Sequence, residues 1–250
     1  MNSNIVLCIP TSFKNRQELA AALENKHGVE YVLMGRIFRS TVSSDSCEIE
    51  IIRNRDRFSS MTSSLADDFE LAGQDKLDFA TLQQIHNCPQ IIYLTSTDSD
   101  YAGCLRIANL ARVLLQVGGI AIKVESSGLA HSGEKWLTNC DSHDVFDIYS
   151  LYVVLVEGKD HYYSCGMHNF GKADVTVSIE SDVGLAIYVM NVFNYYRLTE
   201  SPILQDGHTF QPDIECPHYR LEWVMDRESP AHSPQHNPHG RWYLALDIEH

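Results

Sequence analysis

The sequence lacks the common short signatures that identify a reaction. It contains no G-x-G-x-x-G, P-loop, H-E-x-x-H or G-x-S-x-G pattern, which excludes the common phosphate-binding loops, the zinc-protease helix and the nucleophile elbow. Its seven cysteines form no C-x-x-C pair, which excludes a zinc ribbon and a dithiol redox centre. We therefore expect no cofactor, no metal centre and a role other than catalysis.

Long hydrophobic runs are absent too. The apolar run at residues 151–156 has the length of a strand, whereas a membrane-spanning helix needs about 20 apolar residues. The N-terminal residues M-N-S-N-I-V-L-C-I-P carry no basic residue before their apolar run, unlike a secretory signal peptide. Scattered cysteines suit a reducing compartment. These features predict a cytoplasmic protein with no membrane partner.

Positive charge is scarce. The chain has 19 Lys and Arg residues against 33 Asp and Glu residues, which gives a formal net charge of −14 at pH 7. This excess repels the phosphates of nucleic acids, so no nucleic-acid partner is expected. It favours solubility and speeds association with a basic protein.

The hydrophobic pattern predicts an α+β fold, with mixed sheets, ferredoxin-like βαβ units and helices packed on one face. The chain divides into an N-terminal region (1–88) and a C-terminal region (89–250), or it forms one compact domain. Strands are predicted at residues 5–10, 29–34, 47–52, 90–95, 120–124, 151–157, 162–164, 174–179, 219–225 and 242–248. Helices are predicted at residues 14–26, 58–71, 77–86, 101–117 and 183–196, with a short one after Ser132.

The clearest local unit is the strand–helix–strand segment at residues 90–124. Its helix is apolar on nearly all sides, which indicates burial, and Gly118 and Gly119 end it. We expect a right-handed crossover into a parallel strand pair.

Acidic side chains gather on the two helices predicted between residues 58 and 86. A solvated helical surface explains them, and so does a docking patch for a basic partner. The residues are Asp67, Asp68, Glu70, Asp75 and Asp78.

Four residues are candidates for a hydrolase-like site. Glu125 and His131 follow the strand at 120–124, and loops at strand ends often hold sites in open α/β sheets. His131 lies between Glu125 and Glu134 in the sequence, and a histidine between carboxylates can act as a general base. Cys165 and His168 are a candidate thiol nucleophile and base. All four would need to converge in one pocket.

The segment S-C-G-M-H-N-F-G-K-A-D-V at residues 164–175 is the least generic part of the chain. Gly166 and Gly171 permit a positive φ or a close backbone approach. Phe170 would fix the turn in the core, and Asp174 would accept hydrogen bonds from loop amides. The segment therefore predicts a constrained turn between strands.

A Pro-rich loop near the C-terminus holds His232, His236 and His239. This spacing can ligate a metal if the loop folds back. The loop lacks a helix that would fix the geometry and lacks a nearby acidic or cysteine ligand, so surface histidines are the simpler interpretation.

Two motifs, G-L-A-H-S at residues 128–132 and G-M-H-N-F-G-K-A-D-V at residues 166–175, resemble those of an uncharacterised bacterial domain family. In that family a strand–helix–strand unit leads into a G-L-x-H loop, and a G-M-x-x-F-G-x-x-D/E turn follows. The resemblance covers residues 90–200, and Ala173 stands where the family has proline. In general character the chain is also similar to the immunity proteins of bacterial polymorphic toxin and type VI secretion systems, which are compact, acidic α+β proteins.

The hypothesis from the sequence is an immunity protein that binds a cognate toxin, in particular a basic nuclease, and blocks its active site or substrate groove. The five acidic residues are its expected contacts. The hydrolase-like site is the alternative, and a metal-dependent module built on the C-terminal histidines is a third hypothesis. The oligomeric state is left open.

Overall fold

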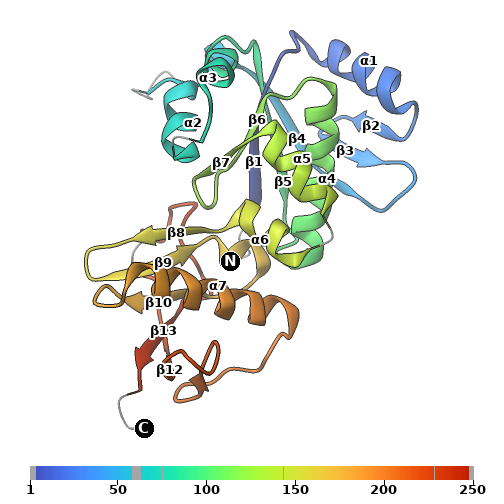
Figure 1. Ribbon diagram of the computed structural model, residues 1–250. Coiled ribbons are helices and arrows are strands. Elements are labelled where there is room, and N and C mark those ends of the chain that lie inside the picture. Colours follow the sequence, from blue (N-terminus) through green and yellow to red (C-terminus); the bar gives the residue numbers. More distant parts are fainter. Residues whose placement is uncertain (1–3, 58–62, 75, 143, 228, 248–250) are drawn as a thin grey trace.

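The protein, a computed structural model that describes residues 4–57, 63–74, 76–142, 144–227 and 229–247, is built on two sheets (Figure 1). The first sheet has the order β2-β3-β4-β5-β1-β6-β7, and every neighbouring pair is antiparallel. Its strands are β1 (Ile5–Thr11), β2 (Tyr31–Met34), β3 (Ile37–Ser40), β4 (Ser46–Arg53), β5 (Gln90–Ser96), β6 (Ala121–Val124) and β7 (Leu129–Ser132). With the helices between them, they confirm the predicted α+β class.

Helices cover both faces of this sheet, so the expectation of helices on one face is corrected (Figure 1). Successive strand residues point to opposite faces. Leu7 packs in a core with α1, α4, α5 and α6, whereas Cys8 packs on the other face against α2 and α3. The helices are α1 (Arg16–His27), α2 (Leu65–Gly73), α3 (Phe79–His86), α4 (Tyr101–Val117), α5 (Gly133–Asp141) and α6 (Val145–Tyr152).

The strands β5 and β6 of the unit β5–α4–β6 run parallel to each other, as predicted, but they are not neighbours in the sheet. The strand β1 lies between β5 and β6 and is antiparallel to both, which makes this a split βαβ unit, as in ferredoxin-like folds. The reason is that β1 is buried on both faces, and such a strand is most stable at the centre of a sheet.

Side-chain caps explain where the helices begin. Each α-helix follows an Asn, Asp or Ser whose side chain accepts a hydrogen bond from a backbone N–H in the first turn. The capping residues are Asn15, Ser64, Asp78, Asp100, Ser132, Asp144 and, for α7 (Val183–Thr199), Asp182. The helix expected at residues 58–71 begins at Leu65, and residues 58–62 lie outside the described part.

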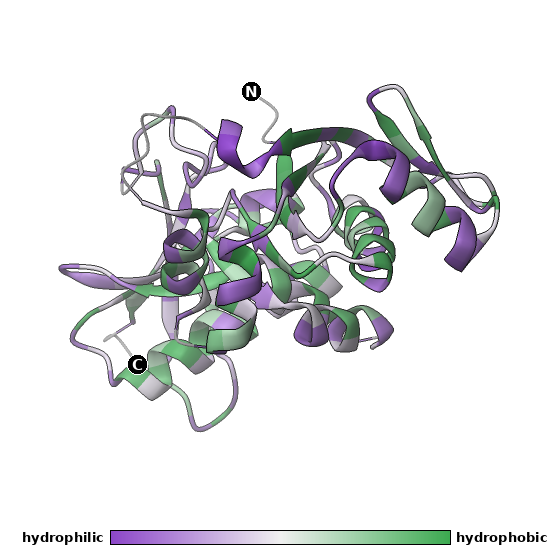
Figure 2. Cartoon of the chain, turned by 90° about the horizontal axis from the view of Figure 1, so that it is seen from above, coloured by the Kyte–Doolittle hydropathy of each residue, from purple (hydrophilic) through white to green (hydrophobic). Residues whose placement is uncertain are grey.

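The second sheet has the order β11-β12-β13-β10-β9-β8, with β10 and β13 parallel and the other neighbours antiparallel. Helix α7 packs on one face through a core that includes Val175, Phe193 and Leu244. The strands are β8 (Val154–Glu157), β9 (His161–Cys165), β10 (Asp174–Ser178), β11 (Thr209–Phe210), β12 (Tyr219–Val224) and β13 (Arg241–Leu246). Hydrophobic segments gather in the middle of the molecule, and several also reach its margins (Figure 2).

The predicted boundary at residue 88 does not follow this architecture. Strand β1, before it, pairs with β5, after it, along the full length of both strands. The chain instead passes from the first sheet to the second near residue 153. Two side chains beyond that point, Met167 and Phe170, still pack in the core of the first sheet.

The segment at residues 164–175 is the constrained turn that its glycines predict. It forms the short 3-10 helix η2 (Met167–Phe170) between Gly166, with φ 124°, and Gly171, with φ 66°. The carboxylate of Asp174 accepts hydrogen bonds from Ser164 Oγ and from the backbone N–H of Met167. The turn thereby links the cores of the two sheets.

In the described part of the chain, no helix has both the length and the apolar character needed to cross a membrane.

Candidate functional site

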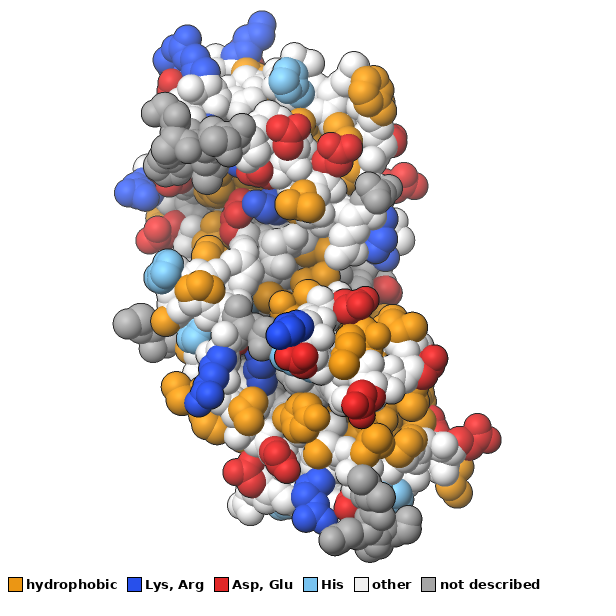
Figure 3. All heavy atoms as spheres, turned by 90° about the vertical axis from the view of Figure 1, so that its left-hand side faces the viewer, with side chains coloured by type: hydrophobic (Ala, Val, Ile, Leu, Met, Phe, Trp, Pro, Cys, Tyr) orange, Lys and Arg blue, Asp and Glu red, His pale blue; other side chains and the backbone are white. Residues whose placement is uncertain are grey.

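A cleft of about 920 Å³ opens between the two sheets. Its floor is the part of the first sheet that α2 and α3 do not cover. Side chains of β1, β4, β5 and β6 line this floor, and residues 231–238 form the opposite wall. Figure 3 faces this side of the molecule, which is hollowed where its upper and lower parts meet.

Charged side chains form pairs along the cleft. Arg57 donates to the carboxylate of Asp68, and Lys123 Nζ lies 2.9 Å from Glu125 Oε2. Burial acts to raise the pKa of Asp68, but hydrogen bonds from Ser63 and Arg57 outweigh it and hold the pKa below its usual value.

The balance of charge in the cleft is negative. Glu50 lines the cleft with the two pairs, so three carboxylates face two cations. An excess of carboxylates in a concave site attracts a basic group. The same floor contains Tyr93, whose hydroxyl forms a hydrogen bond with the thiol of Cys8. Burial raises the pKa of both groups. Neither group supplies an anionic nucleophile at neutral pH.

The wall of the cleft is fixed by hydrogen bonds to both sheets. Gln235 Nε2 donates to the backbone oxygen of Glu125 at 3.3 Å. Asn237 Nδ2 donates to Asp174 at 2.6 Å, and the backbone N–H of Asn237 donates to Asp226 at 2.8 Å. Asp226 is itself paired with the buried Arg241 at 2.9 Å. These anchors hold the loop in one position over the sheet.

The four residues of the hydrolase-like hypothesis have different surroundings. Glu125 lines the cleft, whereas His131 lines a separate cavity of about 510 Å³ beside β7 and β8. Burial lowers the pKa of His131 to about 4, and its Nε2 lies 3.0 Å from the backbone oxygen of Leu151. The structure therefore does not bring Glu125 and His131 into one cavity.

The other two residues lie beneath the C-terminal loop. Cys165 is 5% exposed, and its Sγ lies 3.9 Å from the backbone oxygen of Gln235. Burial raises the pKa of this thiol to about 12. His168 is fully buried and hydrogen-bonds to the backbone of Pro234. Packing against the loop therefore explains why Cys165 and His168 are buried.

The C-terminal histidines do not converge. His236 Nδ1 lies 3.3 Å from Asp226 and 3.2 Å from the backbone oxygen of Ser229. The backbone oxygen of His239 accepts a hydrogen bond from Trp223 Nε1, and His232 is exposed. Among the residues that the structure describes, no three His, Cys, Asp or Glu side chains are placed to hold a metal ion.

The predicted acidic residues divide into two groups. Asp67 closes a capping box with Ser64, Asp68 pairs with Arg57, and Asp78 caps α3 through the N–H of Thr81. These contacts lower the pKa of Asp67 and of Asp78 through hydrogen bonds from the backbone. Glu70 is exposed on α2, and Asp75 lies outside the described residues.

Two hydrophobic side chains beside these acids were not identified from the sequence. Leu71, on α2, is 84% exposed, and Phe79, at the start of α3, is 74% exposed. The face of α2 that carries Asp67 also carries Glu70 and Leu71, because these two residues lie three and four positions after Asp67. In Figure 3, acidic and hydrophobic side chains are interspersed on the upper part of the molecule, where α2 and α3 lie. The helical period contained the signal, since Leu65, Phe69 and Ala72 already fill the buried face of α2.

Comparison with models of protein families, with curated proteins and with solved structures finds no match to this chain.

Proposed function

We propose that this protein neutralises a basic protein toxin by binding it, as an immunity protein does. The observation that carries the proposal is the surface formed by α2 and α3, which we call the docking surface. On it, Leu71 and Phe79 are exposed beside the carboxylates of Asp67, Glu70 and Asp78. Exposed large apolar side chains within a charged rim are typical of protein interfaces.

The charge of the molecule favours a basic partner. The chain has a net charge of −14, and the cleft next to α2 adds an excess of carboxylates. A toxin that acts on nucleic acid carries a basic groove for its substrate, and opposite charge accelerates association with such a groove. In the proposed complex, Leu71 and Phe79 supply the buried anchors and the acids supply orientation.

The placement of the hydrolase candidates supports binding over catalysis. A thiol with a pKa of about 12 that is 5% exposed is a poor nucleophile at neutral pH. Glu125 and His131 line different cavities. Each of these side chains has a structural partner that explains its position.

Co-expression with the product of the neighbouring gene tests the proposal. We expect that product to arrest growth and the wild-type protein to restore it. A Leu71→Asp, Phe79→Asp double variant should fail to restore growth. Val29→Asp and Ile214→Asp are matched controls, because Val29 and Ile214 are 78% and 93% exposed elsewhere on the surface.

The proposal is wrong if the neighbouring product is harmless, or if the double variant protects as well as the wild type. Thermal unfolding of each variant separates loss of binding from loss of folding. Exposed substitutions of this kind change stability by about 0.5 kcal/mol or less.

A further inference from the structure

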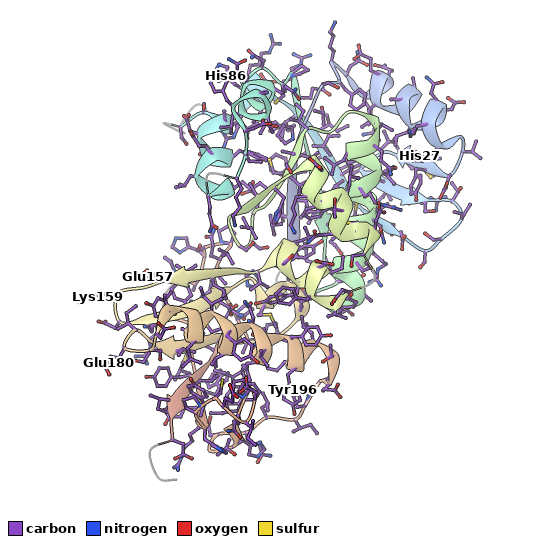
Figure 4. All side chains as sticks on the ribbon, viewed as in Figure 1. His27, His86, Glu157, Lys159, Glu180 and Tyr196 are labelled. Carbon is purple, nitrogen blue, oxygen red and sulfur yellow. The ribbon has the colours of Figure 1, made fainter. Side chains whose placement is uncertain are left out.

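A basic cavity of about 680 Å³ lies at the end of the first sheet where β4 stops and β5 begins. Its described lining contains Lys14, Arg53, Arg55 and Arg57 and no carboxylate. This is unexpected in a chain whose 33 acidic residues outnumber its 19 Lys and Arg residues. His86, labelled at the top of Figure 4, lies at the end of α3 and also lines the cavity.

A smaller cavity of about 320 Å³ continues the basic surface. It shares Lys14 and Arg53 with the first cavity and adds Arg16 and Arg36, with Glu50 as the carboxylate among its lining residues. Basic side chains are visible along the upper rim of Figure 3, at this end of the molecule. Lys14 and Arg53 therefore stand where the two cavities meet.

The cations of the basic cavity differ in whether they form ion pairs with carboxylates. Arg57 is committed to Asp68, and Arg55 lies 3.6 Å from Asp56 in a pair that is exposed on both sides and contributes little. Lys14 and Arg53 are exposed, and within the described residues neither forms an ion pair. Two cations at least are thus available for a ligand.

We propose that the basic cavity binds a compact oligophosphate, such as the phosphate chain of a nucleotide. The guanidinium fork matches two phosphate oxygens at once, and an ammonium group adds a point charge. A volume of about 680 Å³ falls within the range of small-molecule sites. A long nucleic acid would extend beyond the cavity onto the acidic surface of a protein with net charge −14, which repels it. This inference is independent of the proposed toxin binding.

Calorimetric titration with sodium tripolyphosphate and with ATP tests the inference. We expect both to bind to the purified full-length protein, and more weakly as salt is raised. A Lys14→Gln, Arg53→Gln double variant should lose about tenfold in affinity or more. Arg39→Gln is the matched control, because Arg39 is an exposed arginine of β3 that lines neither cavity.

Three results would overturn the inference: no heat with either probe at low salt, equal loss of affinity in the Arg39 control, or tighter binding of a short single-stranded oligonucleotide than of tripolyphosphate. The last would assign the surface to nucleic acid. Thermal unfolding without ligand shows whether the double variant is folded, and Lys14→Gln alone is the fallback variant if it is not.

Discussion

Asn237 donates a hydrogen bond of 2.6 Å to the carboxylate of Asp174, 63 residues earlier in the chain. This contact joins the turn at residues 164–175 to the loop that walls the cleft. Burial raises the pKa of Asp174 to about 6, although hydrogen bonds from Asn237 and from the backbone of Met167 act to lower it. The most distinctive segment of the sequence therefore clamps the loop that walls the cleft.

Removing the clamp should destabilise the protein. Asn237→Ala leaves a buried carboxylate without one of its donors, which costs about 2–3 kcal/mol of unfolding free energy. Urea titration measures this cost. His232→Ala, at an exposed position of the same loop, is the control and should change stability by about 0.5 kcal/mol or less. Equal effects of the two substitutions would show that the contact does not anchor the loop.

Gly166 should tolerate no side chain. Its φ is +124°, and an added Cβ would overlap the backbone oxygen of Tyr152. We expect Gly166→Ala to lower the free energy of unfolding by about 3 kcal/mol or more. Gly207→Ala, with φ +82° and nothing within 4 Å of the added Cβ, should cost about 1 kcal/mol. A Gly166 variant as stable as the Gly207 variant would contradict the packing of the turn.

Acid should destabilise the fold through His168. Burial lowers its pKa to about 4 in the folded protein, against about 6.5 in an unfolded chain. Below pH 6.5 the unfolded chain binds a proton that the folded one does not, so stability is lost as pH falls from 6.5 to 4. Between pH 7 and pH 5 the loss from this group is about 2 kcal/mol. His168→Gln removes it.

Stability measured at both pH values checks the histidine prediction. The difference between wild type and His168→Gln should shrink by the same amount at pH 5. His232→Gln, at an exposed position, should follow the wild type at both values. A constant difference for the His168 variant would mean that the imidazole titrates normally.

Thiol labelling should leave Cys165 unmodified in the native protein. Its raised pKa and its position under Gln235 both oppose reaction. Cys216 is more exposed and should react with iodoacetamide first, as read by mass spectrometry of the digested protein. Rapid native labelling of Cys165 would favour the hydrolase-like alternative.

Local pattern predicted much of the fold. The helix at residues 101–117 matches α4 at both ends, because Asp100 caps it and Gly118 ends it. Sheet order was out of reach. The continuous apolar run at residues 5–10 is typical of a strand buried on both faces, but it does not show that β1 inserts between β5 and β6. The motif at residues 128–132 was expected in a loop, but four of its residues form β7, paired with β6. Helix α6 was missed because its apolar residues continue directly into β8.

The candidate sites were less accessible from sequence. The acidic residues on α2 could be named, but their roles as caps and ion-pair partners depend on Ser64, Arg57 and Thr81. The basic cavity gathers Lys14, Arg53 and Pro89 from three distant segments. No local pattern reports such a convergence, because the sheet creates it.

Calorimetric titration of the purified protein with the purified product of the neighbouring gene tests the central claim most directly. We expect a tight one-to-one complex whose affinity falls as salt is raised. The Leu71→Asp, Phe79→Asp variant should bind at least about a hundredfold more weakly, whereas Val29→Asp should bind as the wild type does. No binding, or binding that the double variant retains in full, would contradict it.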